Sequence, residues 1–193
     1  EADPGSLRSG FTNQTHYLAE RAGFAYWTHQ PNRRVGGVAS SANGLLSRLE
    51  PTLVEDHSLP GRVKGRGVLV ARFNDGEQAL TIAIAHLSLG AQSRLAQVSF
   101  IAELLAGHPN AVLMGDFNCD PHRPEMQPLY RQTGLQPPAE CVPTFPSWKP
   151  QRAIDHMLVT PSLAIASMRA VPAAQSDHLA LSVELDVPEA AVR

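Results

Sequence analysis

The sequence predicts an α+β fold, because many short strand segments alternate with few helices. The chain has 193 residues, of which 43% are hydrophobic and 18% are charged, which is typical of one globular domain with its own core. The apolar run at residues 111–114 predicts a buried strand. Residues 66–73 and 78–86 flank an Asn-Asp-Gly-Glu segment, whose Asp-Gly pair is typical of a tight hairpin turn. We expect a single domain over residues 1–193.

Composition narrows the classes of protein to which the chain can belong. The net charge of −2 gives no global basic field of the kind that attracts nucleic acids. No apolar stretch is long enough for a membrane helix, and no signal-peptide pattern begins the chain. Cys119 and Cys141 form neither a disulfide framework nor a zinc-binding spacing, so we expect a cytoplasmic protein. We also expect a monomer rather than an obligate oligomer.

The first third of the chain predicts one helix, then two strands separated by a loop. The helix is expected at residues 13–22, the strands at 24–29 and 44–49, and the loop at 30–37. Thr12 or Asn13 would cap the start of the helix, and Gly23 would end it.

The second strand of the hairpin places three aliphatic side chains and His86 on one face, because side chains alternate along a strand. A helix follows at 91–106, with a predicted apolar stripe of Leu95, Val98, Ile101, Ala102 and Leu105. A short helix is expected at 124–132, followed by a proline-rich irregular passage. The remaining strands are expected at 152–160, 163–171 and 179–185.

Polar side chains gather where these strands begin or end. Asp116 and Asn118 follow the buried strand, and His86 ends the hairpin. Asp155 lies in line with apolar neighbours, where an unpaired carboxylate is costly. Each feature alone has a structural explanation, such as an Asx-turn or a histidine that is hydrogen-bonded within the core. Together with the Asp177–His178 pair, they indicate one site at a single edge of the sheets.

Four sequence pieces carry a resemblance to a known family. They are Ala85-His86-Leu87-Ser88, Gly115-Asp116-Phe117-Asn118, Ile154-Asp155-His156-Met157-Leu158 and Ser176-Asp177-His178. In order and spacing they resemble the endonuclease/exonuclease/phosphatase family, which includes pancreatic-type DNases, abasic-site nucleases, neutral sphingomyelinases and inositol polyphosphate 5-phosphatases. The segment at 144–148 is similar to a bacterial branch of that family.

The resemblance implies a DNase I-like, four-layer sandwich, in which two facing and mostly antiparallel sheets are covered outside by helices. It also implies that the family's first strand and helix, with an Asn near the metal, lie upstream of Glu1. On that expectation the 193 residues alone would bind Mg²⁺ weakly, hydrolyse poorly and expose an unpaired sheet edge that favours association.

The resemblance further implies a metal-dependent phosphoesterase. Glu1 and Asp177 would hold Mg²⁺ or Mn²⁺, which prefer oxygen ligands. Asp116 would deprotonate the attacking water, and Asn118 would donate a hydrogen bond to a phosphate oxygen or to the nucleophile. His178, held by Asp155, would polarise the phosphate, while His86 would contact the phosphate or assist the leaving group. His156 alternates away from Asp155, so we expect it to be packed or solvated rather than catalytic.

Two functions remain open on the sequence alone. The first is hydrolysis of a phosphodiester or phosphomonoester in a nucleic acid, a nucleotide or a lipid headgroup. The second is a non-catalytic relative that uses the same scaffold for binding, which would be expected to lack one of the four residues Asp116, Asn118, Asp155 and His178, whereas all four are present.

Overall fold

The computed structural model describes residues 2–35, 39–62, 64–172 and 176–191. Its strands form a five-stranded sheet in the order β3-β4-β5-β6-β7 and two two-stranded pieces, β1-β2 and β8-β9. The strands are β1 (Tyr26–Val35), β2 (Ala39–Ser47), β3 (Leu53–Ser58), β4 (Gly67–Phe73), β5 (Leu80–Ala85), β6 (Asn110–Asp116), β7 (Asp155–Val159), β8 (Ala164–Val171) and β9 (Ala180–Asp186). The helices are α1 (Gln14–Ala22), α2 (Ala91–Leu105) and α3 (Gln127–Thr133), with short 3₁₀ turns at η1 (Leu7–Ser9), η2 (Pro124–Met126) and η3 (Glu189–Ala191).

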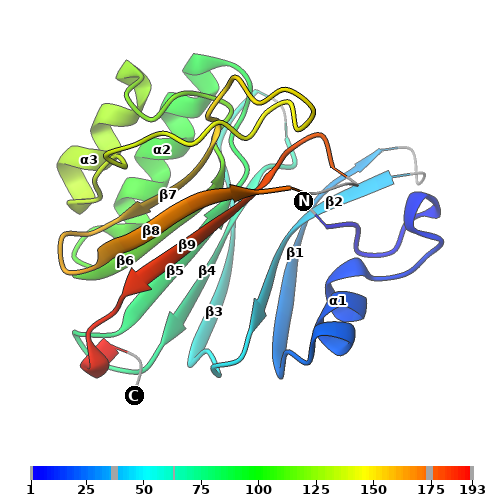
Figure 1. Cartoon of the computed structure of the whole chain (residues 1–193), viewed down its shortest axis with the longest axis horizontal. Coiled ribbons are helices and arrows are strands. Elements are labelled where there is room, and N and C mark those ends of the chain that lie inside the picture. Colours follow the sequence, from blue (N-terminus) through cyan, green and yellow to red (C-terminus); the bar gives the residue numbers. More distant parts are fainter. Residues whose placement is uncertain (1, 36–38, 63, 173–175, 192–193) are drawn as a thin grey trace.

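The layers follow from which elements cover each face of the five-stranded sheet. Helices α2 and α3 lie on one face, while β1-β2 and β8-β9 lie across the other (Figure 1). Helix α1 contacts β1 and β2 from outside. Among the described strands, only the β5–β6 pairing is parallel. The predicted arrangement of two mostly antiparallel sheets with outer helices is therefore confirmed.

Side chains that alternate along β6 and β7 contribute to two separate hydrophobic cores, one on each face of the five-stranded sheet. Leu113 of β6 and Leu158 of β7 face the helices, where they pack with the buried stripe of α2. Their neighbours Val112 and Val159 face the other sheet and pack with Leu45 of β2. Burial of both faces is what makes β6 an almost continuous apolar run.

Helix α1 begins and ends as the sequence predicts. The side chain of Asn13 accepts hydrogen bonds from the backbone N–H groups of Thr15 and His16, and Gly23 adopts a left-handed conformation after the last turn. The predicted apolar stripe of α2 is confirmed at four positions, but Leu95 is 42% exposed.

The β-sheets differ from the sequence-based expectations at three places. Strand β1 continues to Val35 through most of the segment expected to be a loop, because it pairs with β2 across a bulge between Pro31 and Arg33. Strand β3 was not predicted. In the β4–β5 turn, Gly76 has the positive φ expected of it, 88°, but the second left-handed residue is Asn74, with a φ of 68°, rather than Asp75.

Buried amides join β1-β2 to the five-stranded sheet near the start of β4 and the end of β5. The side-chain nitrogen of Asn43 on β2 donates to the carbonyl oxygens of Gly67 on β4 at 2.9 Å and Ile84 on β5 at 3.2 Å. It also lies 3.0 Å from Oε1 of Gln30 on β1. The Gln30 amide occupies the space into which a side chain at position 67 would project. These hydrogen bonds satisfy polar groups that would otherwise be buried between the sheets without partners.

Within the described ranges, no helix combines the length and the apolar character needed to cross a membrane.

Candidate active site

The parallel pair β5–β6 brings two polar side chains to one edge of the sheet. His86 follows the last residue of β5, and Asp116 is the last residue of β6. Nε2 of His86 lies 3.3 Å from Oδ2 of Asp116. The close approach depends on Gly115, whose φ is 139° and where an added Cβ would overlap the carbonyl oxygen of Ala85. A glycine is therefore needed for the two strand ends to meet.

The antiparallel pair β6–β7 adds a second carboxylate. Asp155, the first residue of β7, is the register partner of Asp116. Oδ2 of Asp155 accepts a hydrogen bond from the hydroxyl of the fully buried Thr144 at 2.5 Å. The same oxygen lies 2.7 Å from Nδ1 of His178. Asp155 thus has the partners that a carboxylate in an apolar strand requires.

The segment before β9 is held in place by the proline-rich passage. The backbone N–H of Ser147 donates to the carbonyl oxygen of Asp177 at 2.7 Å, and the Ser147 hydroxyl donates to that of Ser176, also at 2.7 Å. The ring of Phe145 lies 4.9 Å, centroid to centroid, from the ring of His178. This passage therefore supports the segment that carries His178.

These strand ends surround a cavity of about 740 Å³. His86, Asp116, Asp155, Asp177 and His178 all line it, and Gln14, Asn43 and Ser176 complete its polar wall. Ligand atoms of Asp116, Asp155 and His178 lie within 4.8 Å of one another. The cavity wall is rich in carboxylate oxygens, which Mg²⁺ and Mn²⁺ prefer, so it fits a hard divalent cation. Asp177, one of the two expected metal ligands, lines the same cavity but is not part of this group of three. Glu1, the other expected metal ligand, lies outside the described residues.

The environment of Asp116 changes its affinity for a proton. Burial raises the pKa of this carboxyl group, and the neighbouring Asp155 adds to that rise. His86 and the backbone N–H of Asn118, which is 2.8 Å from Oδ1, act in the opposite direction but do not cancel it. A carboxylate with a raised pKa accepts a proton more readily than an exposed one.

Asn118 lies just beyond β6 in a left-handed conformation, with a φ of 55°. Its side-chain nitrogen donates to the carbonyl oxygen of Leu87 at 2.9 Å. The backbone N–H of Leu87 in turn donates to the carbonyl oxygen of Asp116, also at 2.9 Å. The segments that follow β5 and β6 are therefore tied together directly beside the cavity.

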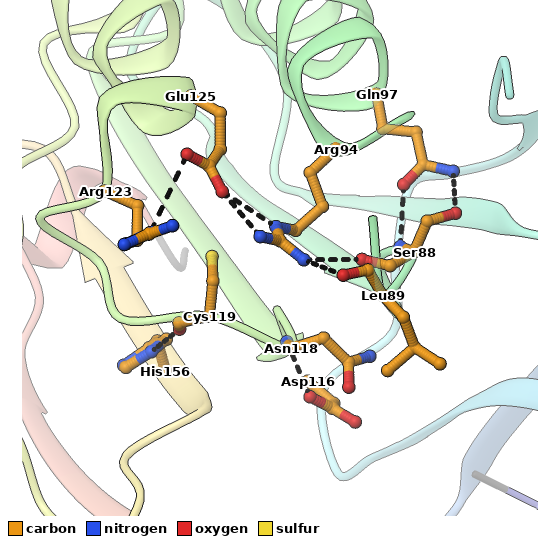
Figure 2. Close-up of polar contacts among 10 residues, drawn as sticks. All are labelled: Ser88, Leu89, Arg94, Gln97, Asp116, Asn118, Cys119, Arg123, Glu125 and His156. Atoms are coloured by element: carbon orange, nitrogen blue, oxygen red, sulfur yellow. Dashed lines mark hydrogen bonds and ion pairs between the residues drawn. The ribbon is translucent and has the colours of Figure 1, made fainter. Parts of the chain in front are cut away.

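The side chain of His156 points away from the carboxylates of Asp116 and Asp155. It is 3% exposed, and its Nε2 lies 2.8 Å from the carbonyl oxygen of Cys119 (Figure 2). Its ring packs near that of Phe117 on the helix side of the sheet. Burial lowers the pKa of His156, so its neutral form is favoured. The expectation that it alternates away from Asp155 and packs is confirmed.

Sequence reasoning missed two supporting side chains. Thr144 reaches Asp155 only through the tertiary path of the irregular passage, so no local pattern predicts the contact. Arg94 lies outside the predicted apolar stripe of its helix, and no sequence signal singles it out, yet it is buried and contacts the segment that follows β5.

Comparisons with known proteins agree with this geometry. The model of the Endonuclease/Exonuclease/phosphatase family matches residues 1–178 of the chain. A search of curated proteins gives no match.

Several solved structures share the fold. A mannosyl-6-phosphatase from Bacteroides thetaiotaomicron is 18% identical with a TM-score of 0.66, over 90% of this chain and 81% of that one. The human Nocturnin catalytic domain, solved with a bound sulfate anion, is 16% identical with a TM-score of 0.68, over 90% and 78%. A Neisseria 3′ phosphatase, NExo, bound to a product DNA hairpin, is 19% identical with a TM-score of 0.66, over 96% and 87%. The predicted DNase I-like sandwich is thus confirmed.

Proposed function

The chain belongs to the endonuclease/exonuclease/phosphatase family, and from this premise we propose that it is a divalent-metal-dependent phosphoesterase. The observation that carries the proposal is the convergence of His86, Asp116, Asp155 and His178 on one cavity. These residues come from four separate segments of the chain, so turn chemistry at a single strand end does not account for their meeting. The reaction would be hydrolysis of a phosphodiester or a phosphomonoester by water.

Asp116 would act as the general base in this reaction. It would accept a proton from the water as the water oxygen forms its bond to phosphorus and the bond to the leaving oxygen breaks. The raised pKa of Asp116 supports this role, because a base with a pKa nearer to neutral transfers protons more effectively. His86, 3.3 Å from Asp116, would contact the phosphate or give a proton to the leaving oxygen.

Two other side chains would bind the phosphate. His178 has its Nδ1 held by Asp155, which leaves Nε2 for a phosphate oxygen. Asn118 uses one N–H on Leu87, and its second N–H would donate to a phosphate oxygen or to the nucleophile. Asp177, together with Glu1 by sequence resemblance, would hold a Mg²⁺ or Mn²⁺ ion, which neutralises negative charge on the phosphoryl group when bound.

The substrate class is left broad within this proposal: a nucleic acid, a nucleotide or a lipid headgroup. The similar structures include a phosphatase of a sugar phosphate and a phosphatase bound to DNA, so the shared fold does not rank these substrates. We further propose one domain over residues 1–193, acting as a monomer. A cytoplasmic location is proposed as well, on the grounds that Cys119 and Cys141 are both free.

The test is a panel of phosphodiesters and phosphomonoesters assayed with Mg²⁺, with Mn²⁺ and with chelator. Asp116→Asn and His178→Ala should each reduce hydrolysis by about a hundredfold or more, because each removes a participant in proton transfer or charge stabilisation. The alternative function, a non-catalytic binding relative, makes a different forecast. If the protein is a binding relative, the folded wild type should bind phosphorylated compounds but hydrolyse no member of the panel. That result would overturn the proposal.

A further inference from the structure

Arg94 is a buried arginine outside the cavity. It lies in the first turns of α2 and is 5% exposed. Its Nε and Nη2 contact Oε1 of Glu125 at 3.2 and 2.5 Å. Its Nη1 donates to the carbonyl oxygens of Ser88 at 3.1 Å and Leu89 at 2.5 Å. One guanidinium group thus joins the segment after β5 to the segment after β6 (Figure 2).

The ion pair with Glu125 is enclosed by protein. Glu125 is 8% exposed. Burial is the largest single influence on its pKa and raises it, but the hydrogen bond and charge of Arg94, a backbone hydrogen bond and the charge of Arg123 together outweigh burial and leave that pKa lowered. Separating a buried pair leaves a charge without a partner, which costs more free energy than an exposed pair contributes. The planar fork of Arg94 therefore restrains both segments at once.

Gln97, one turn further along α2, holds the same loop at a second point. It is fully buried, its Oε1 accepts from the backbone N–H of Ser88 at 2.8 Å, and its Nε2 donates to the Ser88 hydroxyl at 3.0 Å. Together with Arg94, it engages the N–H, the carbonyl and the hydroxyl of Ser88. Little freedom remains for this residue to move relative to α2.

Ser88 is next to the groups proposed to act on the phosphate. Leu87, directly before it, accepts the side-chain N–H of Asn118 through its carbonyl oxygen at 2.9 Å. Since a carbonyl can only accept, this contact fixes which end of the Asn118 amide faces Leu87, and so sets the direction of the second N–H. His86 lies one residue further back on the same restrained segment.

We propose that Arg94 is a positioning residue, which holds the segment from His86 to Leu89 so that His86 and Asn118 are aligned with the reacting phosphate. This inference deepens the proposed function and rests on it. Arg94 acts on His86 and Asn118 through the loop, whose Ser88 and Leu89 carbonyl oxygens it binds. Lysine cannot replace it, because a single ammonium nitrogen cannot reach Glu125 and two carbonyl oxygens in the same geometry.

Arg123 offers a matched control on the same carboxylate. Its Nε lies 3.9 Å from Oε2 of Glu125, but it is 57% exposed and contributes no contact to the segment after β5 in Figure 2. Arg94→Met and Arg123→Met therefore remove the same chemical group from the same partner. Only the first releases Ser88 and Leu89.

The first measurement is steady-state kinetics on the best substrate of the panel. Arg94→Met should lower kcat by about a hundredfold, which is the effect of misplacing catalytic groups by about 1 Å. KM and the Mg²⁺ concentration for half-maximal rate should stay within about threefold of the wild-type values. Arg94→Lys should not restore kcat, and Arg123→Met should match the wild type. The combination of Arg94→Met with Asn118→Ala should cost less than the product of the single effects, because both act through the same segment. The proposal would be overturned by an unchanged kcat in Arg94→Met, or by a double variant whose loss of kcat equals the product of the two single losses.

The second measurement does not depend on activity. NMR spectra of protein with labelled histidine rings should show the His86 resonances displaced by Arg94→Met and unchanged by Arg123→Met, while those of His178 stay in place in both variants. If the wild type hydrolyses no panel member, the proposed function fails while this spectrum still decides the positioning role. If Arg94→Met does not fold, Gln97→Met is tested in the same way. Unmoved His86 resonances in a folded variant would show that the network is structural only.

Discussion

Nδ1 of His178 lies 2.7 Å from Oδ2 of Asp155, although 23 positions separate the two residues in the sequence. The hydroxyl of Thr144 donates to the same oxygen at 2.5 Å. One carboxylate oxygen therefore serves two donors from different segments. The orientation of the His178 ring depends on Asp155, and that of Asp155 depends in part on Thr144.

Asp155→Asn should lower kcat by about a hundredfold, a loss typical of disabling one acid–base or charge-stabilising group. An amide in place of the carboxylate removes the negative charge beside His178 and replaces one of the two acceptor oxygens by a donating NH₂ group. The measurement is kcat on the best panel substrate, together with thermal unfolding to show that the variant is folded.

Thr144→Val is the graded companion of that variant. It keeps the shape of the side chain and the charge on Asp155 but removes one hydrogen bond, so the free energy of unfolding should fall by about 1 kcal/mol. The loss in kcat should be much smaller than for Asp155→Asn. Equal losses of kcat for Thr144→Val and Asp155→Asn would show that the orientation of Asp155 depends wholly, rather than in part, on Thr144.

Gly115→Ala should destabilise the protein by about 3 kcal/mol or more, because the new methyl group meets the carbonyl oxygen of Ala85 and the φ of 139° is strained for any other residue. Gly134→Ala is the control, since φ there is 72° but no atom lies within 4 Å of the added Cβ. It should cost only about 1–2 kcal/mol of backbone strain. Urea unfolding of both variants measures the difference, and similar values would show that the β5–β6 approach is not tight.

His156 should make the protein sensitive to acid. Its pKa is lowered in the folded state, so below pH of about 6.5 the unfolded chain binds a proton that the folded protein excludes. Stability is thus lost as the pH falls through this window, by at most about 1.4 kcal/mol per pH unit for one proton. His156→Gln, which can still donate to the Cys119 carbonyl, should flatten this slope.

Urea titrations of both proteins between pH 8 and 5.5 measure that slope. Turnover by His156→Gln at pH 8 should stay within about threefold of the wild type, because the ring packs on the helix side of the sheet rather than in the cavity. A loss as large as that of His178→Ala in a folded variant would show that the alternation argument for His156 is wrong.

Removal of divalent metal should abolish hydrolysis, and added Mg²⁺ should restore it. Binding to the folded state alone should also raise the melting temperature, with about 2.7 kcal/mol of added stability at a hundred times the dissociation constant. Asp177→Asn should increase the Mg²⁺ concentration needed for half of either effect by about tenfold or more, because it removes a negatively charged oxygen ligand. Identical Mg²⁺ titrations for wild type and variant would remove Asp177 from the metal site.

The parts of the fold that the sequence predicts are those whose signals are local. Helix α1 has its Asn13 cap and Gly23 end, and the β4–β5 hairpin has Gly76 in its turn. Strand β3 was missed because most of its side chains are exposed and it includes Glu55 and Asp56, so it has no alternation between apolar and polar positions. It is stabilised by pairing with β4, which no local pattern reveals.

The site shows the same division. Asp116 was identifiable because a buried strand ends at it, and His156 because alternation turns it away from Asp155. The hydrogen bond from Thr144 and the burial of Arg94 were not predictable, since both depend on where a distant segment crosses the strand ends. Arginine in an amphipathic helix is usually solvated, so its charge gave no sign of enclosure.

The amide of Gln30 fills the space beside Gly67, and that arrangement has an evolutionary consequence. A methyl group at position 67 would overlap the Gln30 side chain. A shorter residue at position 30 would leave a cavity and remove one of the hydrogen-bond acceptors of the Asn43 amide. The two positions therefore constrain each other across the interface between the sheets. In descendants of this sequence, a larger residue at 67 should be accepted only together with a smaller one at 30, and either change alone should be selected against.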